Sequence, residues 1–219
     1  MPEIPDRDKV EAAILARLQP QFDEWRDRFA TSLGDPPDIA RLTPGLVSSF
    51  EEDTAMALMM LVGIGEYEAA QLRMATDHDV TVDPGQVRRD AQRWAYSWSK
   101  RVAQEFTTNT VKALQEIVRQ YAPGTMKLAT ELAEVLDEKR AGRLVVTELT
   151  RVASDGERDF VQRWSLNLQA FWRTARDAKV CPTCAPLDKR RVVELASDFA
   201  FGPPAHVNCR CYVEWREPE

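Results

Sequence analysis

The C-terminal sequence Cys181-Pro-Thr-Cys184, followed after 21 residues by His206-Val-Asn-Cys209-Arg-Cys211, decides how the last part of this chain folds. It holds all four cysteines of the chain and one of its two histidines. A Cys-x-x-Cys turn places two thiolates on one side of a tight loop, which suits a tetrahedral zinc ion. We predict a structural zinc site with the ligands Cys181, Cys184, His206 and Cys209. Cys211 is an alternative ligand, because residues two apart in a strand point the same way.

Three other interpretations of the cysteine cluster stay open. The thiols could pair as disulfides. The Cys-x-x-Cys motif could be a redox pair, although no βαβ pattern precedes it. Zinc deaminases use P-C-x-x-C with an upstream H-x-E, but here the proline follows Cys181 and no H-x-E occurs. A closed site with four protein ligands has no open coordination position, which argues against zinc-dependent hydrolysis.

The composition of the whole chain is that of an ordinary globular protein. Of its 219 residues 44% are hydrophobic and 29% charged, and the formal net charge is −6. This length allows one good-sized core, or a helical body with a small appendage. The negative charge argues against a generally basic surface that coats nucleic acid, although it allows a local basic patch.

The sequence lacks the usual signals for membranes, secretion and common enzyme chemistry. No run of about 18 apolar residues occurs, so we expect no transmembrane helix and no membrane partner. The start, MPEIPDRDKVEAA, lacks the basic-then-apolar pattern of a signal peptide, so we expect synthesis in the cytoplasm. Cys-x-x-Cys pairs in a reducing compartment are more often metal ligands or redox pairs than disulfides. No P-loop, GxGxxG, HExxH or GxSxG motif is present, so we do not expect an enzyme.

Apolar residues recur every three or four positions over most of the first 170 residues, which predicts an elongated helical bundle. The predicted helices span residues 7–32, from 46 or 49 to 74, 86–121, 125–137 and 140–170. Ser49, with Glu52 three residues later, has the pattern of a capping box at the start of the second helix. The residues expected to bend, break or end helices are Pro20, 34–37, Gly63, Gly65, 107–110 and 123–124.

The pattern changes near residue 170, where short strands, turns and prolines replace the helical periodicity. Residues 171–174 and 211–215 alternate as strands do. We therefore predict a helical body over 1–170 and a C-terminal Cys/His metal-binding module over 171–219. The predicted fold class is mainly α, an elongated bundle with a small α+β module stapled by zinc.

The C-terminal residues form a pattern that extends beyond the cysteines. It comprises Trp172-Arg-Thr174, Asp177, Val180-Cys181, Cys184, Leu187-Asp188, Pro203-Pro204, His206, Cys209-Arg210-Cys211 and, upstream, Arg140-Ala141 and Thr147-Glu148. Over about residues 140–214 this pattern resembles the head-morphogenesis family of tailed bacteriophages, the Mu F-like minor head proteins. The family pattern has a glycine after Leu-Asp, where this chain has Lys189.

The resemblance implies a role in phage assembly. It implies a minor head (capsid) protein, made in the host cytoplasm and then enclosed in the virion head. Such a protein binds the portal protein or the major capsid protein from inside. The resemblance also implies a possible part in DNA packaging or ejection, and the chain could be oligomeric.

Two further features have alternative interpretations. Lys189, Arg190 and Arg191 could contact DNA phosphates, or they could form a solvated surface, since acidic residues are almost as many in this region. This basic run supports an alternative function, a nucleic-acid-binding zinc module on a helical stalk. Glu148 belongs to the family-like pattern, but a single helical carboxylate does not specify catalysis. We expect it to make a buried or interfacial hydrogen bond, for example to Arg140 or Arg143.

Overall fold

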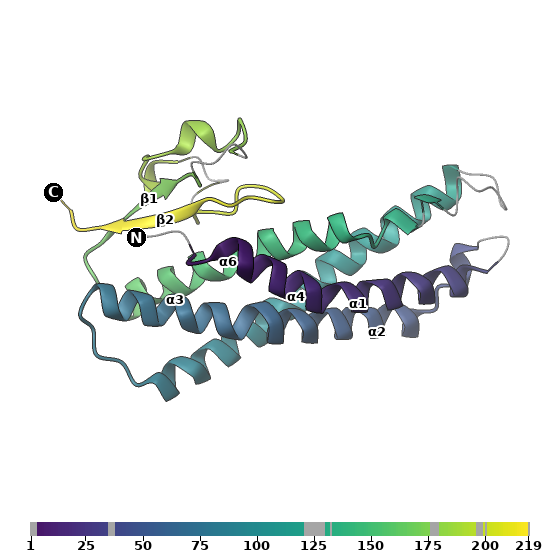
Figure 1. Cartoon of the computed structure of the whole chain (residues 1–219), viewed down its shortest axis with the longest axis horizontal. Helices are drawn as coiled ribbons and strands as arrows, with labels where there is room; N and C mark the ends of the chain where they lie inside the picture. Colours follow the sequence, from purple (N-terminus) through teal and green to yellow (C-terminus); the bar gives the residue numbers. More distant parts are fainter. Residues whose placement is uncertain are drawn as a thin grey trace.

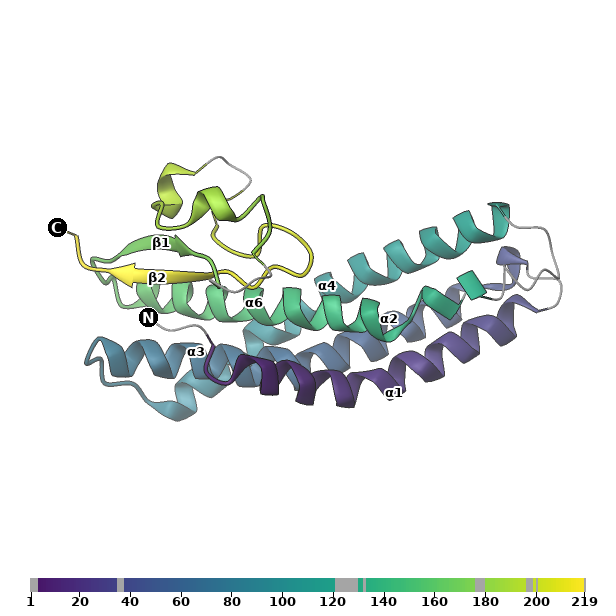
Figure 2. The same cartoon turned by 45° about the horizontal axis from the view of Figure 1, so that its top comes forward.

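A computed structural model describes residues 4–34, 38–120, 130–131, 133–175, 180–195, 199 and 201–218. Long helices run side by side, and a small sheet with its loops lies against one end of them (Figures 1 and 2). The N-terminus and the C-terminus both lie at that end. The predicted fold class, mainly helical with two short C-terminal strands, is confirmed.

Within the described residues, five long helices build the body. They are α1 (Arg7–Leu33), α2 (Pro44–Leu58), α3 (Ile64–Asp77), α4 (Pro84–Gln120) and α6 (Glu138–Arg163). The short helical turns are η1 (Ile39–Arg41), η2 (Met59–Gly63), η3 (Ala185–Leu187) and η4 (Val192–Glu194). No helix in the described ranges is long and apolar enough to cross a membrane.

Helix α1 follows its apolar stripe into the core. Its buried side chains include Leu18, Phe22 and Trp25, at the spacing that places residues on one helix face. The helix continues through Pro20, so the prediction that this residue splits it is wrong. It ends at Gly34, which has a φ of 73°.

Helices α2 and α3 form one nearly continuous rod through η2, which is a π-helical turn. The rod begins earlier than predicted, because Pro44 occupies its first position and the Thr43 hydroxyl accepts a hydrogen bond from the Leu46 N–H. Ser49 therefore lies inside α2 and is not its cap. The π turn ends at Gly63, where an added Cβ would lie 2.8 Å from the Trp98 ring. Glycine thus allows α4 to pack closely at this point.

Helix α4 is uninterrupted across the polar residues 107–110, which do not break it as predicted. Thr107 and Thr110 are both buried. The Thr110 hydroxyl donates to the Phe106 carbonyl at 2.8 Å and accepts from Arg140 at 2.9 Å. The satisfied Thr110 hydroxyl is compatible with a helix interior, whereas the buried Thr107 hydroxyl has no hydrogen-bond partner among the described residues.

Helix α6 is capped by Asp137, whose side chain accepts from the Arg140 N–H at 2.8 Å. It ends at Arg163 rather than near residue 170, and β1 begins at Gln169. The predicted stop at 123–124 and residues 125–129 and 132 of the predicted helix 125–137 lie outside the described residues, whereas residues 130–131 and 133–134 are helical.

The two strands, β1 (Gln169–Arg173) and β2 (Tyr212–Arg216), pair antiparallel, with Phe171 opposite Glu214. Trp172 belongs to β1, and its buried side chain forms a small core with the cysteines and neighbouring apolar residues. Its buried members are Trp172, Cys184, Leu187, Leu195, Cys209 and Cys211. The larger core of the helical body is separate, and aromatic rings of α1, α2 and α4 meet in it.

Candidate metal centre

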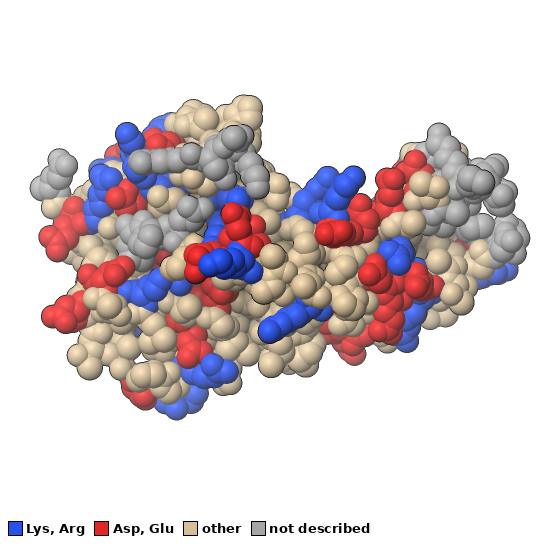
Figure 3. All heavy atoms as spheres, viewed as in Figure 1, with Lys and Arg blue, Asp and Glu red and all other residues tan. Residues whose placement is uncertain are grey.

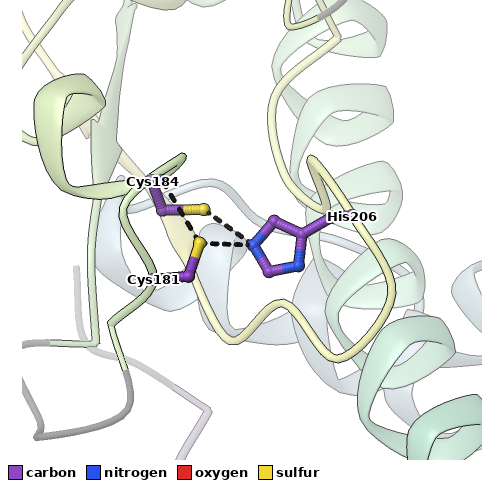
Figure 4. Close-up of side chains that lie close together, drawn as sticks. All are labelled: Cys181, Cys184 and His206. Atoms are coloured by element: carbon purple, nitrogen blue, oxygen red, sulfur yellow. Dashed lines mark hydrogen bonds between the residues drawn. The ribbon is translucent and has the colours of Figure 1, made fainter.

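The five predicted donor side chains come together at the small core of the C-terminal segment. Figure 4 shows the sulfurs of Cys181 and Cys184 facing the same ring nitrogen of His206. The Cys181 Sγ–His206 Nε2 distance is 2.8 Å and the Cys184 Sγ–His206 Nε2 distance is 3.1 Å. On the other side, Cys184 Sγ lies 3.8 Å from Cys209 Sγ.

Two tight turns position these donors. In the first, the Cys184 N–H points to the Cys181 carbonyl at 3.1 Å and to its sulfur at 3.3 Å. In the second, the Cys209 N–H donates to the His206 carbonyl at 3.2 Å. Asn208 precedes Cys209 with a φ of 66°, a left-handed conformation that asparagine tolerates better than most residues. The two turns thus present two pairs of donors from segments more than 20 residues apart.

The donors form two groups of three that share Cys184. One contains Cys181, Cys184 and His206, and the other contains Cys184, Cys209 and Cys211; within each group all donor atoms lie within 4.8 Å of one another. All five line one cavity of about 40 Å³.

The distances are close to those of a tetrahedral zinc site. Zn–S bonds of about 2.3 Å and Zn–N bonds of about 2.0–2.1 Å place two sulfurs about 3.8 Å apart and a sulfur about 3.5 Å from a nitrogen. The separation of the Cys184 and Cys209 sulfurs already has this value. The His206 nitrogen is less than about 1 Å too close to its two sulfurs, so small side-chain rotations would admit an ion. If Cys181, Cys184, His206 and Cys209 are to bind one ion together, the two groups of donors must also move closer to each other.

The hydrogen bond made by His206 Nδ1 determines that Nε2 is the ring nitrogen available to bind a metal ion. Nδ1 lies 2.8 Å from the Val207 carbonyl oxygen, so Nδ1 carries the proton and donates it. Nε2 then keeps its lone pair towards the two sulfurs. Metal-binding histidines commonly use this arrangement, in which the outer nitrogen donates to a backbone carbonyl.

Cys211 supports the thiolate form of Cys209. A hydrogen bond from the Cys211 thiol is the main cause that lowers the pKa of Cys209 to about 5. The same bond raises the pKa of Cys211 far above its usual range. Burial raises the pKa of Cys184 to about 12. The geometry thus makes Cys209 a ready anionic donor and Cys211 its hydrogen-bonding neighbour.

The turn that carries His206 and Cys209 is docked onto helix α6. The Asn208 N–H donates to the Thr147 hydroxyl at 2.8 Å. One turn further along the helix, the Thr150 hydroxyl donates to the Cys209 carbonyl at 2.6 Å. Thr147 therefore acts as an anchor for the donor-bearing turn, which gives this residue of the family-like pattern a structural role.

The start of α1 joins the same junction. Arg7 is buried and donates to the Thr150 hydroxyl at 2.5 Å and to the Arg210 carbonyl at 3.2 Å. The Arg210 side chain in turn forms ion pairs with Asp8 and, at 3.3 Å, with Glu11. Sequence reasoning identified Arg210 but missed Arg7 and Thr150, which lie far from the cysteines in the chain and carry no motif.

Trp172, Asp188 and Pro204, which also belong to the family-like pattern, lie in the described part of the C-terminal segment. Trp172 is fully buried beside the cysteines, and the Asp188 carboxylate accepts from the Thr174 N–H at 3.0 Å. Pro204 follows Pro203 through a cis peptide bond. Asp177 lies outside the described residues.

Glu148 is buried, as expected, but its partners are neither of the two that were predicted, Arg140 and Arg143. Its carboxylate accepts from the Trp98 indole N–H at 3.2 Å and from Arg151 at 3.0 Å. Arg140 lies two turns away on α6 and donates to the Val135 carbonyl and to Thr110 instead. Burial raises the pKa of Glu148. Glu148 thus links α4 to α6 and does not point into the metal centre.

The basic run forms the turn after Asp188. Lys189 takes the left-handed conformation with a φ of 66°, so it fills the glycine position of the family pattern at a conformational cost. Its N–H donates to the Trp172 carbonyl at 2.7 Å. The Lys189 and Arg190 side chains are exposed, and Arg191 forms an ion pair with Glu194 at 3.0 Å. Figure 3 shows basic and acidic side chains interspersed on the visible face of the molecule.

No family model matches the chain, and no curated protein or solved structure matches it. The functional inference therefore depends on the residues of this chain and their arrangement. Those residues form a compact Cys/His centre that could hold a metal ion. Hydrogen bonds join this centre to helices α6 and α1.

Proposed function

We propose that this chain is a minor head protein of a tailed phage or prophage, in which a structural zinc ion fastens the C-terminal module to the helical body. The observation that carries the proposal is the hydrogen bond between the Asn208 N–H and the Thr147 hydroxyl. It joins two parts of the family-like pattern that are 61 residues apart in the chain. A pattern whose separate parts meet at one junction supports a common structural purpose better than isolated motifs do.

Zinc is the metal that the donors suit best. Thiolates and one imidazole are the ligands of closed structural zinc sites, whereas Mg²⁺ and Ca²⁺ prefer oxygen ligands. With four protein ligands the ion has no position for a substrate, so the centre acts as a clamp and not as a catalyst. In a small module of this kind, metal binding and folding are coupled.

In this proposal the clamp keeps both ends of the chain at one end of the bundle. The helical surfaces are then left to bind the portal protein or the major capsid protein. The chain acts in the host cytoplasm during head assembly and stays inside the finished head.

Affinity purification with the portal protein encoded in the same genome tests this function. The tagged chain is expected to retain the portal protein, and mass spectrometry is expected to find the chain in purified virions. A Cys184→Ser variant is the matched control, because it removes the donor shared by both groups. Absence of the chain from virions, together with no portal retention, would refute the proposal.

A nucleic-acid-binding role is the second candidate, and the exposure of Lys189 and Arg190 is the observation that favours it. Replacing Lys189, Arg190 and Arg191 by alanine should then abolish a salt-dependent affinity for double-stranded DNA. DNA binding that is unchanged in this variant, or absent in the parent chain, eliminates this candidate. A head protein could also touch DNA, so the two functions are compatible.

A further inference from the structure

The outer face of the bundle around Tyr96 contains two neighbouring hollows. One, of about 520 Å³, is formed by α4 and is lined by Arg89, Arg93 and Tyr96, among others. The other, of about 410 Å³, lies between α2 and α4 and is lined by Glu51, Glu52 and again Tyr96. Because both hollows share Tyr96, they form one continuous surface with this residue between its two ends.

The middle of this surface is apolar and open. Tyr96 is 57% exposed, Met56 is 58% exposed and Met60 is 60% exposed. Met56 and Met59 line the same hollow as Tyr96, and Met60 follows in the same rod. Single exposed apolar side chains are common, but Tyr96 and Met56, which are both exposed and line one hollow, indicate an interaction surface. Methionine adapts its shape well to a partner.

The two ends of the surface carry opposite charges. Arg89 and Arg93 lie at one end, with side chains 60% and 75% exposed. Their ion pairs with Asp83 and Asp90 are local to the start of α4 and leave the guanidinium groups accessible. At the other end, Glu51 and Glu52 line the hollow together with one cation, Lys100, so this end carries an excess of negative charge. The Lys100 ammonium donates to the Tyr96 hydroxyl at 2.7 Å.

We propose that a second copy of this chain docks on this surface, related by a two-fold axis that passes close to Tyr96. Such an axis, lying in the plane of the contact and across the line between the two charged ends, exchanges those ends. The basic end of each copy then meets the acidic end of the other, and the methionines and tyrosines meet in the middle. Two-fold contacts require this self-complementarity, in which each patch is matched by a different patch of the same surface. The proposed contact does not involve the Cys/His centre. The proposal of a dimer also does not depend on the proposed role in head assembly.

The test measures the oligomeric state of the purified full-length chain. Sedimentation velocity over a range of protein concentrations is expected to show a monomer–dimer equilibrium that weakens with added salt. Glu52→Arg and Arg89→Glu are each expected to weaken dimerisation by about tenfold, because each variant creates two like-charge contacts per dimer. The double variant with both changes restores opposite charges across the axis and should recover most of the affinity.

Two further comparisons separate loss of contact from loss of folding. Met56→Glu is expected to abolish the dimer, and its far-UV circular dichroism should match that of the parent because the side chain is exposed. Glu24→Arg, a charge reversal on α1 away from this surface, should leave the equilibrium unchanged. A chain that is monomeric at all concentrations overturns the proposal, and so does a dimer that Met56→Glu and the single charge reversals leave intact.

Discussion

Replacing Thr150 by valine should destabilise the junction between helix α6, the start of α1 and the donor-bearing turn. Valine keeps the side-chain shape but removes the hydroxyl that donates to the Cys209 carbonyl at 2.6 Å and accepts from Arg7 at 2.5 Å. Arg7 keeps other acceptors, including Glu11 and the Arg210 carbonyl, so the main loss is at the Cys209 carbonyl. A buried group left without its partner costs about 1–3 kcal/mol.

We therefore expect a loss of about 2 kcal/mol, which corresponds to a fall in melting temperature of roughly 4–8 °C for a chain of this size. Thermal unfolding of the purified protein, followed by circular dichroism, measures this loss. Thr108→Val is the matched control, because Thr108 is an exposed threonine in the middle of α4. Its stability should stay within about 0.5 kcal/mol of the parent. Equal melting temperatures for the two variants would show that the junction does not hold the segment in place.

Three more predictions concern the helical rod, the basic turn and a buried carboxyl. Gly63→Ala should destabilise the protein by about 1–3 kcal/mol, because its Cβ would lie 2.8 Å from the Trp98 ring. Gly65→Ala has open space around it and should stabilise the protein by up to about 1 kcal/mol. Urea titration measures both changes. Lys189→Gly should raise stability by up to about 1 kcal/mol, since glycine adopts a φ of 66° without strain; a lower melting temperature would contradict this. Burial raises the pKa of Glu157 from 4.5 to about 7, so the folded state binds its proton more tightly than the unfolded state and stability is lost as pH rises between these values. The loss amounts to roughly 3 kcal/mol at most, and Glu157→Gln should remove it. Parallel curves of stability against pH for parent and variant would show that Glu157 is not the group responsible.

The helical body was largely predictable because its apolar residues keep a helical period over long stretches. The errors came from local signals that the packing outweighs. Pro20 lies inside α1 without ending it, and the helix predicted to begin at residue 46 or 49 begins at Pro44 with Thr43 as its cap. The pair Thr43-Pro44 is itself a good start signal, because threonine caps helices and proline suits their first position.

The candidate metal centre was predictable only in its donors. Their spacing predicts that Cys181, Cys184, His206 and Cys209 meet, because the two tight turns are local. The docking of that centre depends on contacts between distant segments, such as the contact of Arg7 with Thr150. Contacts of this kind leave no periodicity or motif in a single sequence, so they became visible only in the folded chain.

Native mass spectrometry of the purified chain tests the central claim, a zinc ion that fastens the C-terminal segment, most directly. We predict one zinc ion per chain, lost in Cys184→Ser, the variant that removes the donor common to both groups. The zinc-free variant should also show early proteolytic cleavage within the C-terminal module, residues 171–219. A parent chain that carries no zinc, has the mass of a disulfide-bonded form and resists proteolysis would contradict the account.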